Sequence, residues 1–232
     1  MARPEEVRGI FTEIAGGYDR FNDVASLGID RLWRREAVRR AALFEGARVL
    51  DLAAGTGDLS LALAREGKAA LVVSSDFTQA MLSRARVKAK GLEGPTRLAF
   101  ALADALGLPF ADASFDVATI SFGLRNLSDR PAGYREALRV LKPGGRLVIL
   151  ELTRPPSALV RAGYELYRRH FLPLLGRAIA GSRDPYEYLD RSIAAFPAPE
   201  ELARELTQAG FARVEHVAMT FGIAAIHVAS KA

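Results

Sequence analysis

A glycine-rich turn between a predicted buried strand and a predicted helix constrains this sequence more than any other segment. Residues Arg48 to Leu59, RVLDLAAGTGDL, begin with an apolar run that contains Asp51, pass through small residues to Gly57, and continue from Asp58 with a helical pattern. A strand, a glycine-rich turn and a helix start in this order form the nucleotide-binding unit of open α/β sheets. The segment therefore predicts a ligand site that includes Gly55 and Gly57 at the end of a parallel strand.

An acidic residue farther along the chain supports this prediction. Asp76 follows Gly57 by 19 residues and ends the apolar run ALVVSSD. In such units the acid at the end of the second strand accepts hydrogen bonds from the ribose of the ligand. Phe77, directly after it, could stack on the base, and its alternative role is that of an ordinary core aromatic residue.

The charges around the turn favour a cationic ligand over a diphosphate. A dinucleotide site has a third glycine three residues after the second, where this chain has Ser60. The carboxylates of Asp51 and Asp58 would repel a pyrophosphate at the helix start. They suit S-adenosylmethionine, a methyl donor that carries a sulfonium and an ammonium group and has no phosphate. We therefore expect S-adenosylmethionine as the cofactor.

The composition favours one α/β domain in the cytoplasm. With 232 residues, of which 50% are hydrophobic, the chain can form one large α/β domain with a helical insert. No apolar run reaches about 18 residues and no leader is evident, which predicts a soluble protein. The absence of cysteine excludes disulfides, thiolate metal sites and methyl transfer through a cysteine adduct on a pyrimidine. The net charge of +5 is compatible with a solvated surface, nucleic acid or an anionic membrane.

Predicted helices and strands alternate through the middle of the chain, which indicates a parallel sheet with helices on both faces. After an N-terminal helix from Pro4 to Gly16, the expected helices are Asp30 to Leu43, Leu59 to Glu66, Thr78 to Lys90 and Pro131 to Leu141. The expected strands after the first are Ala70 to Asp76, Thr96 to Leu102, Phe115 to Phe122 and Arg146 to Leu152. The segment LKPGGR, Leu141 to Arg146, is expected to end a helix and turn into the next strand.

The pattern changes after Pro155. Residues 157–210 are predicted to be helical without a clear strand, and ARVEHVAM and GIAAIHVASK are predicted to form two final antiparallel strands. We therefore expect a single domain over residues 1–232. Its expected parts are N-terminal helices (1–45), a cofactor-binding core (46–152), a helical cap (153–210) and a C-terminal strand pair (211–232).

The ends of the third and fourth strands supply further candidate residues. Asp104 in ALADALGLPF could accept a hydrogen bond from an adenine amino group or could simply cap a helix. In TISFGLRNLSD, Arg125 and Asn126 offer a fixed cation and an amide that suit an oxyanion of the substrate. An enzyme that methylates an amino group of a flipped base would have an Asn/Asp-Pro-Pro-aromatic run here, and none is present. We therefore expect no nucleic-acid substrate.

Taken together, these segments resemble the ubiquinone/menaquinone biosynthesis C-methyltransferases, of the bacterial demethylmenaquinone methyltransferase type. SFGLRN and DPYEYLDRSIAAFP are the most specific matches, and VLDLAAGTGDL, LKPGGRLVILE and GIAAIH extend the resemblance nearly from end to end. The resemblance implies a Rossmann-like class I methyltransferase with a mostly parallel seven-stranded sheet, an antiparallel C-terminal strand and a helical cap. It assigns donor binding to Thr56, Asp76, Asp104, Ala105 and Ser121. The chain departs from the family pattern at Ala53 and Ala54, where Gly-Gly is usual, and at Asp30, where histidine is common.

The resemblance further implies C-methylation of a polyprenylated quinol ring, from demethylmenaquinol to menaquinol. A benzoquinol of the ubiquinone pathway, another small-molecule acceptor and a non-enzymatic nucleic-acid-binding module remain as alternatives. Loss of the phenolic proton would raise the electron density of the adjacent carbon, and Arg125 would stabilise the phenolate. The candidate bases are Tyr18, Asp19 and His227. The three histidines, His170, His216 and His227, lack metal-ligand spacing, so we expect no metal.

An acceptor with an isoprenoid tail resides in a membrane. The segment from Arg161 to Arg177 mixes aromatic residues and leucines with four arginines, Arg161, Arg168, Arg169 and Arg177. This composition suits peripheral contact with the inner face of the plasma membrane. Packing of this helix on its own domain is the alternative. A homodimer is compatible with the sequence.

Overall fold

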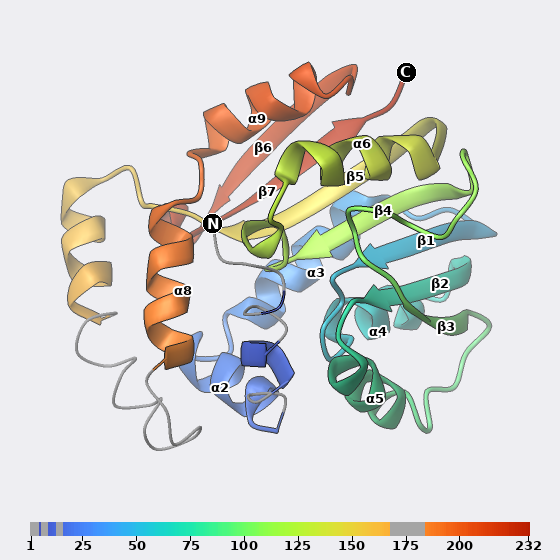
Figure 1. The fold of residues 1–232 in the computed structure, drawn as a ribbon, viewed down its shortest axis with the longest axis horizontal. Helices are drawn as coiled ribbons and strands as arrows, with labels where there is room; N and C mark the ends of the chain where they lie inside the picture. Colours follow the sequence, from blue (N-terminus) through green and yellow to red (C-terminus); the bar gives the residue numbers. More distant parts are fainter. Residues whose placement is uncertain (1–4, 6–8, 13–15, 168–183) are drawn as a thin grey trace.

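A seven-stranded sheet forms the centre of the protein (Figure 1). The computed structural model describes residues 5, 9–12, 16–167 and 184–232. The strands follow the spatial order β3-β2-β1-β4-β5-β7-β6, and β7 runs antiparallel to both of its neighbours. The predicted sheet, mostly parallel with an antiparallel C-terminal strand, is therefore confirmed. The strands are β1 (Ala47–Leu52), β2 (Ala69–Asp76), β3 (Arg97–Leu102), β4 (Phe115–Ser121), β5 (Leu141–Leu152), β6 (Arg213–Met219) and β7 (Ala224–Ser230).

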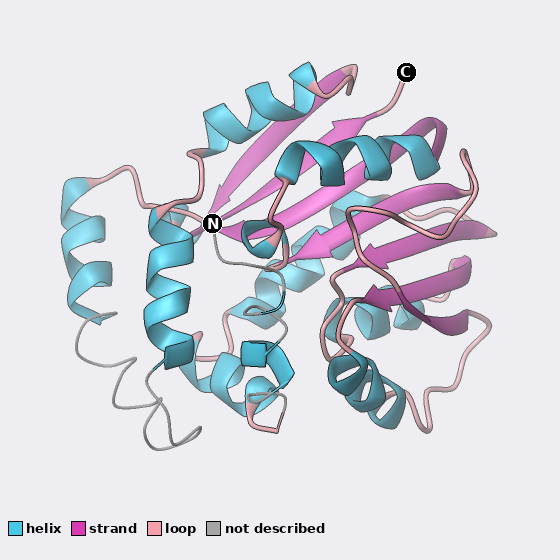
Figure 2. Ribbon diagram, viewed as in Figure 1, coloured by secondary structure: helices cyan, strands magenta, loops and turns pink. Residues whose placement is uncertain are grey.

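Helices lie on both faces of this sheet (Figure 2). Helices α3 and α4 pack on one face, and α6 and α9 pack on the other. Helices α2 and α8 lie beyond the carboxyl ends of the parallel strands, on the left of Figure 1. The helices are α2 (Tyr18–Ala25), α3 (Asp30–Ala41), α4 (Asp58–Arg65), α5 (Gln79–Lys88), α6 (Arg130–Val140), α8 (Asp184–Ala194) and α9 (Pro199–Gln208), with 3₁₀ turns η1 (Leu124–Asn126) and η2 (Thr220–Gly222).

The central strands β1 and β4 are mostly apolar because their successive side chains enter two separate cores. In β1, Val49 packs with α3 and α4, whereas Leu50 and Leu52 pack with α6 and α9. Asp51 is the exception in this strand, since it is only 1% exposed and carries a carboxyl group. A buried carboxyl group in such a strand requires hydrogen-bond partners, which the site supplies.

Two segments differ from the sequence-based expectation. LKPGGR does not precede the fifth strand but lies inside it: Leu141 pairs with Phe115, and pairing resumes at Arg146 opposite Val117. The residues between form a bulge in which Gly144 has a φ of +75°, so the Pro-Gly pair bends the strand without ending it. Helix α2 was not predicted, because it follows Gly16 and Gly17, which signal a helix end.

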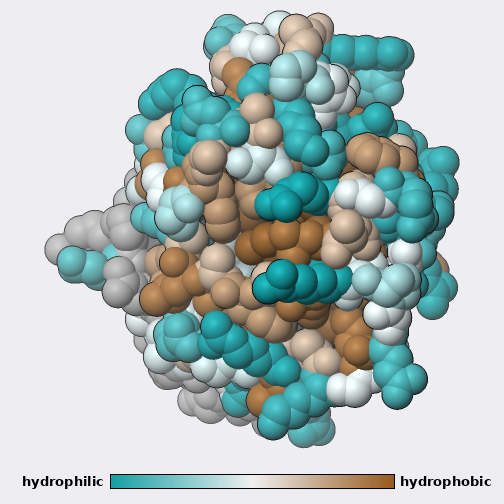
Figure 3. All heavy atoms as spheres, turned by 90° about the vertical axis from the view of Figure 1, so that its right-hand side faces the viewer, coloured by the Kyte–Doolittle hydropathy of each residue, from teal (hydrophilic) through white to brown (hydrophobic). Residues whose placement is uncertain are grey.

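The cap region is also more divided than expected. Residues 158–167 and α8 lie beyond the strand ends, whereas α9 packs on β6 and buries Leu202 and Leu206 in the sheet core. Residues 168–183 of the expected cap lie outside the described residues. Figure 3 shows the opposite end of the molecule, where the parallel strands begin and hydrophilic residues surround an apolar area. The predicted site residues other than His227 line cavities at the cap end or directly contact residues that do.

Candidate active site

The carboxyl ends of β1 to β4 line a pocket, which we call the strand-end pocket. Phe11 and Tyr18 from the N-terminal segment also line it, as do Phe122 and Asn126 after β4. Among the predicted cofactor-binding residues, Gly57 alone does not line it. Those that do are Asp51, Gly55, Thr56, Asp76, Phe77, Asp104, Ala105 and Ser121.

Positive φ angles shape the glycine turn. Gly55 has a φ of +57° and Gly57 a φ of +82°, a region in which glycine is free of strain. A Cβ atom on Gly57 would come within 3.0 Å of the Cβ of Ala85, so this glycine lets α5 pack directly behind the turn. Ala53, at the position where the family usually has glycine, also has a positive φ of +46°.

Asp76 ties the turn to the end of β2. Its Oδ2 accepts a hydrogen bond from the backbone N–H of Gly55 at 2.8 Å, and its Oδ1 accepts one from that of Thr78 at 2.8 Å. Burial raises the pKa of Asp76, and the two N–H donors oppose this change. Each carboxylate oxygen keeps a further lone pair, so Asp76 can still accept from a ligand in the pocket.

Asp51 lies at the base of the strand-end pocket with two hydroxyl partners. Its Oδ2 accepts from Ser60 Oγ at 2.5 Å, and its Oδ1 accepts from Thr119 Oγ1 at 2.6 Å. Burial raises the pKa of Asp51 to about 6, although both hydroxyls and the charge of Arg34 favour the ionised form. Ser60, which replaces the third glycine of a dinucleotide site, therefore serves as a partner of this carboxylate.

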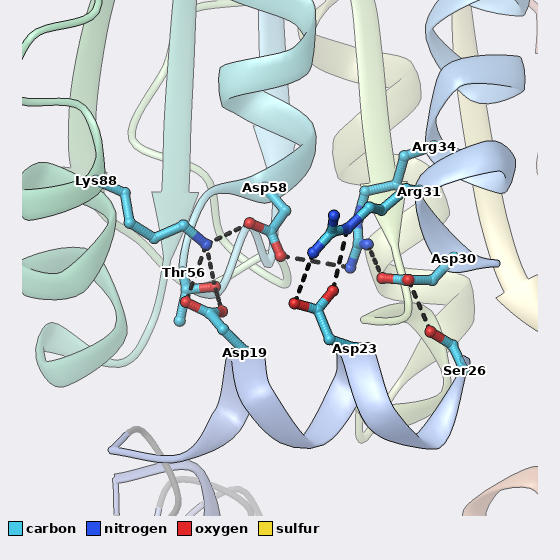
Figure 4. A network of polar contacts seen from close by, with 9 residues as sticks. All are labelled: Asp19, Asp23, Ser26, Asp30, Arg31, Arg34, Thr56, Asp58 and Lys88. Atoms are coloured by element: carbon cyan, nitrogen blue, oxygen red, sulfur yellow. Dashed lines mark hydrogen bonds and ion pairs between the residues drawn. The ribbon is translucent and has the colours of Figure 1, made fainter. Parts of the chain in front are cut away.

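A network of ion pairs surrounds the turn (Figure 4). Lys88 on α5 contacts Asp19 Oδ2 at 3.0 Å and Thr56 Oγ1 at 3.2 Å, and it forms a close ion pair with Asp58. Thr56 Oγ1 donates to Asp19 Oδ1 at 2.5 Å. Helix α2 is therefore fixed to the glycine turn through the carboxylate of Asp19.

Arg34 extends this network toward α3. It forms a close ion pair with Asp30 and lies 3.6 Å from Asp58 Oδ2. Its guanidinium carbon also lies 5.4 Å from the ring centroid of Phe122, a cation–π distance. Asp30, where the family commonly has histidine, also accepts a hydrogen bond from Ser26 Oγ at 2.7 Å. Both of its carboxylate oxygens therefore have a partner within the protein.

A second, more apolar cavity of about 340 Å³ adjoins the strand-end pocket, and we call it the apolar cavity. Tyr18, Arg34 and Phe122 line both cavities and so form the wall between them. Phe122 has a φ of +57°, an unusual conformation for a bulky residue and one that is typical of functional sites. The remaining lining residues come mainly from α2, α3, η1, β5, the cap and η2, and include Trp33, Arg125, Tyr164, Tyr167, Leu189 and Thr220.

Arg125 contributes a buried cation to the apolar cavity. Its Nη1 lies 2.5 Å from Glu151 Oε1 and donates to the carbonyl of Phe122 at 2.6 Å. Burial alone would lower the pKa of Arg125, but Glu151, followed by the phenols Tyr18 and Tyr188, raises it overall. Among the described residues, no partner satisfies the buried Nε of Arg125. This unpartnered donor distinguishes Arg125 from a purely structural arginine.

Asn126 belongs to the strand-end pocket and not to the apolar cavity. Its Oδ1 accepts from Tyr188 OH at 2.9 Å, which links the cap helix α8 to η1. Ser121, the last residue of β4, has a buried Oγ without a hydrogen-bond partner in the described part of the chain. Gly123 between them has no room for a side chain, since a Cβ would lie 2.7 Å from that of Ala53. The segment SFGLRN therefore packs directly against the glycine turn.

The three predicted bases occupy very different environments. Tyr18 lines both cavities, and Asp19 is held by Thr56 and Lys88. His227 lines neither cavity: it lies within β7, is fully buried, and its Nε2 is 2.9 Å from the carbonyl of Pro199. Burial lowers the pKa of His227 to about 4. The structure does not bring His227 together with the other candidates, so we do not carry it forward as a base.

Several residues of the site escaped the sequence-based prediction. Lys88 sits near the end of a predicted helix, where a lysine normally stabilises the helix terminus. Trp33, Arg34 and Phe122 carried no motif that pointed to a cavity wall. For the described residues, no cluster of three or more His, Cys, Asp or Glu side chains could hold a metal ion. Among the same residues, no helix has both the length and the apolar composition needed to cross a membrane.

Comparison with known proteins gives consistent matches over the whole chain. A model of the ubiE/COQ5 methyltransferase family matches residues 1–231. The demethylmenaquinone methyltransferase of Clavibacter sepedonicus is 48% identical over 97% of this chain and 90% of its own length. That of Thermus thermophilus is 47% identical over 96% of this chain and 100% of its own length. The ubiquinone/menaquinone biosynthesis C-methyltransferase UbiE of Dinoroseobacter shibae is 41% identical over 95% of this chain and 88% of its own length.

Solved structures share the fold at lower identity. A SAM-dependent methyltransferase from Thermotoga maritima, described as a possible histamine N-methyltransferase, superposes with a TM-score of 0.67 at 22% identity, covering 97% of this chain and all of its own. A phosphoethanolamine N-methyltransferase from Haemonchus contortus, solved with S-adenosylhomocysteine, gives 0.64 at 17% identity over 85% of this chain and 52% of its own. These likenesses confirm the Rossmann-like methyltransferase fold.

Proposed function

The chain belongs to the ubiE/COQ5 methyltransferase family, and on this premise we propose that it methylates a ring carbon of a polyprenylated quinol, converting demethylmenaquinol to menaquinol. The methyl donor is S-adenosylmethionine. One observation carries the proposal: a polar strand-end pocket and an apolar cavity share a wall of three residues, Tyr18, Arg34 and Phe122. A cationic donor and an apolar acceptor can therefore meet across this wall.

The strand-end pocket fits the proposed donor. Asp76 and Asp104 face the pocket with acceptor oxygens for ribose hydroxyls and the adenine amino group. The unpartnered hydroxyl of Ser121 indicates a missing hydrogen-bond partner in the same pocket. Asp51 and Asp58 supply negative charge at the turn, as a ligand with sulfonium and ammonium groups requires.

The apolar cavity supports an aromatic acceptor. Trp33, Phe122, Tyr164 and Tyr167 provide aromatic surfaces around a volume of about 340 Å³. Arg125 adds the unpartnered Nε donor at the side of β5. An apolar pocket with few polar groups is typical of sites for small aromatic ligands.

In the proposed mechanism the protein aligns the reactants and assists the loss of one net proton from the quinol. The donor supplies a methyl group that moves to the nucleophilic ring carbon while its bonding pair stays on sulfur. Arg125 stabilises the phenolate oxygen through its Nε donor. Tyr18, the base candidate that lines both cavities and lies within electrostatic reach of Arg125, acts in its phenolate form and takes the hydroxyl proton of the quinol. After methyl transfer, the hydrogen on the methylated carbon leaves as a proton, and the ring becomes aromatic again. One of the two protons returns to the phenolate oxygen of the product, and the other is released. The walls of both cavities exclude water.

A methyl-transfer assay tests the proposed acceptor. Purified protein is incubated with methyl-labelled donor and with short-chain demethylmenaquinol or the corresponding benzoquinol. We expect labelled product from the naphthoquinol at a kcat/KM at least tenfold above that of the benzoquinol. The opposite preference would assign the chain to the ubiquinone pathway, and no transfer to either quinol would refute the proposal. The proposed chemistry uses the charge of the sulfonium, so a chelator should leave the rate unchanged.

We further propose that the cap end touches the inner face of the plasma membrane, where the isoprenoid tail resides. Four exposed apolar side chains flank residues of the apolar cavity: Leu27 (71% exposed), Leu159 (84%), Leu166 (63%) and Phe221 (80%). Exposed apolar groups gathered around one cavity indicate an interaction surface. Three of the four arginines expected to assist, Arg168, Arg169 and Arg177, lie outside the described residues. The fourth, Arg161, donates hydrogen bonds to the carbonyls of Pro155 and Pro156.

Flotation with anionic liposomes tests the membrane proposal with a matched pair of variants. Phe221→Ser removes an exposed aromatic ring beside the apolar cavity. Phe44→Ser removes one that is 54% exposed and lies just before the first residue of β1, at the opposite end of that strand from the strand-end pocket. We expect Phe221→Ser to reduce the floated fraction about fivefold, since burying one such ring contributes roughly 1–2 kcal/mol, and Phe44→Ser to leave it unchanged. Equal flotation of both variants would exclude this surface.

A further inference from the structure

Lys88 contacts three partners around the glycine turn and has no role in the proposed function as described so far. Its Nζ meets the carboxylates of Asp19 and Asp58 and the hydroxyl of Thr56 (Figure 4). The ammonium group is partly buried, with 27% of the side chain exposed, which weakens the screening of these contacts by water. Lys88 therefore bridges two acids, and because it offsets only one of their two negative charges, a net negative charge remains beside the pocket for a cationic donor.

The position of Lys88 is set by the turn itself. Gly57 allows α5 to approach so closely that its Ala85 lies where a side chain of residue 57 would stand. Ala85 is one helical turn before Lys88, so the close packing fixes the base of the lysine side chain. The ammonium group thus reaches the turn from a rigid element, which is the arrangement that positions a site most accurately.

Lys88 also fixes the direction of the Thr56 hydroxyl. The single proton of Thr56 Oγ1 goes to Asp19, and one of its lone pairs accepts from Lys88. The remaining lone pair can only accept, so this hydroxyl can bind the ammonium group of a donor but cannot donate to its carboxylate. An orientation of this kind selects a cation at this point of the pocket.

Asp19 transmits the effect to the wall between the two cavities. It directly follows Tyr18, which lines both cavities and opens helix α2. We infer that Lys88 is a positioning residue of the donor site: it holds Asp19 and Thr56 in place and thereby sets Tyr18 between donor and acceptor. This inference rests on the proposed donor, and it does not depend on the identity of the acceptor.

The test compares Lys88→Met with Lys90→Met, which removes an exposed lysine two residues farther along. Calorimetric titration with S-adenosylhomocysteine measures donor-site affinity without turnover. We expect Lys88→Met to weaken binding about tenfold, Lys88→Arg to restore most of it, and Lys90→Met to have no effect. Equal affinity of Lys88→Met and Lys90→Met would overturn the inference. If the wild-type protein did not bind the ligand, the proposed function would fail instead.

A double-mutant cycle separates positioning from general stabilisation. If Lys88 acts through Asp19, adding Lys88→Met to Asp19→Asn should weaken binding by less than a further twofold. Full additivity of the two losses would contradict the inference. Thermal unfolding without ligand supplies a check on folding. Should Lys88→Met not fold, Asp19→Asn and Lys88→Arg decide the question, because the inference requires Asp19→Asn to weaken binding about tenfold as well.

Discussion

The two cavities of this protein are built in opposite ways. The strand-end pocket draws its polar groups from the ends of neighbouring parallel strands, and Asp51, Asp76 and Thr56 are held there by fixed hydrogen bonds. The apolar cavity draws its walls from segments far apart in the sequence, from α2 to η2. Its main charged groups already form ion pairs within the protein: Arg125 pairs with Glu151, and Arg34 pairs with Asp30.

This difference teaches what each region contributes to a transfer reaction. Polar groups with fixed directions recognise one charged donor, whereas an apolar cavity accepts a ring by shape and burial. If this division holds, substitutions in one cavity should change one half of the reaction and leave the other half intact. The following predictions test that separation.

The largest effect is expected for Arg125→Lys. Lysine keeps a charge opposite Glu151 but loses the planar fork and the unpartnered Nε donor. We expect kcat to fall roughly 10³-fold, equivalent to about 4 kcal/mol, with unchanged affinity for S-adenosylhomocysteine. Steady-state kinetics and calorimetry provide the measurements. Arg130→Lys, which alters an ion pair with Glu205 outside both cavities, is the matched control and should leave kcat unchanged.

The second prediction concerns pH and contrasts Asp51, beneath the strand-end pocket, with His227, outside both cavities. The folded pKa of Asp51 is raised from 3.8 to about 6, so its contribution to stability falls as the pH rises through this interval. The folded pKa of His227 is lowered from 6.5 to about 4, so its contribution increases as the pH rises through nearly the same interval. The two groups therefore change the free energy of unfolding in opposite directions, each by about 3 kcal/mol.

Each single variant should therefore expose the effect of the other group. Between about pH 4 and 6, Asp51→Asn should become more stable with rising pH, and His227→Gln should become less stable. Urea unfolding across this range measures both slopes. Parallel slopes for the two variants would show that these groups do not titrate as their burial implies.

The third prediction concerns Asp76→Asn. The amide nitrogen would face one of the two backbone N–H groups that now donate hydrogen bonds to Asp76, so one of these bonds would be lost. The hydrogen bonds to the ribose would also be weakened. We expect about 50-fold weaker binding of S-adenosylhomocysteine, or about 2.3 kcal/mol, without a change in acceptor affinity. Asp116→Asn is the matched control, because Asp116 also accepts a backbone N–H, that of Arg48, at the other end of the sheet. A comparable loss in that control would point to general destabilisation.

The smallest effect is expected at Ala53, the alanine with a φ of +46° in the turn. Ala53→Gly should relieve backbone strain and stabilise the protein by about 0.5 kcal/mol, after the entropic cost of glycine. Ala54→Gly, at a neighbouring position that does not have a positive φ, should destabilise it by about 0.5–1 kcal/mol. Chemical denaturation distinguishes the two signs. A gain at both positions would mean that flexibility of the turn, and not the sign of φ, determines stability.

The sequence predicted the strand-end pocket far better than the apolar cavity. A strand end is a local feature, so most of the candidate residues predicted from the RVLDLAAGTGDL pattern and the spacing to Asp76 line this one pocket. The apolar cavity depends on how α2, the cap and the C-terminal hairpin pack against one another. The local periodicity of hydrophobic residues does not predict such long-range packing. Trp33 and Phe122 were therefore not predicted to belong to a site, although both line the cavity.

Individual residues show the same limit. Arg125 was predicted to be a fixed cation, but its partner Glu151 is 26 positions away, and no local pattern links the two residues. Lys88 was not predicted to belong to the site, since its three contacts depend on the packing of Gly57 against Ala85. The Pro-Gly bulge in β5 was read as a turn because turn chemistry and bulge chemistry use the same residues.

A single hydrogen bond bears on how the chain matures during synthesis. The indole N–H of Trp33 donates to Thr220 Oγ1 at 2.8 Å and joins residues 187 positions apart. The last residue that lines the strand-end pocket is Ser128, whereas the apolar cavity is complete only with Ile223. On the ribosome, the acceptor side of the enzyme is therefore the last part that can form. A chain truncated before η2 would lack a wall for the quinol while keeping every residue that lines the donor pocket.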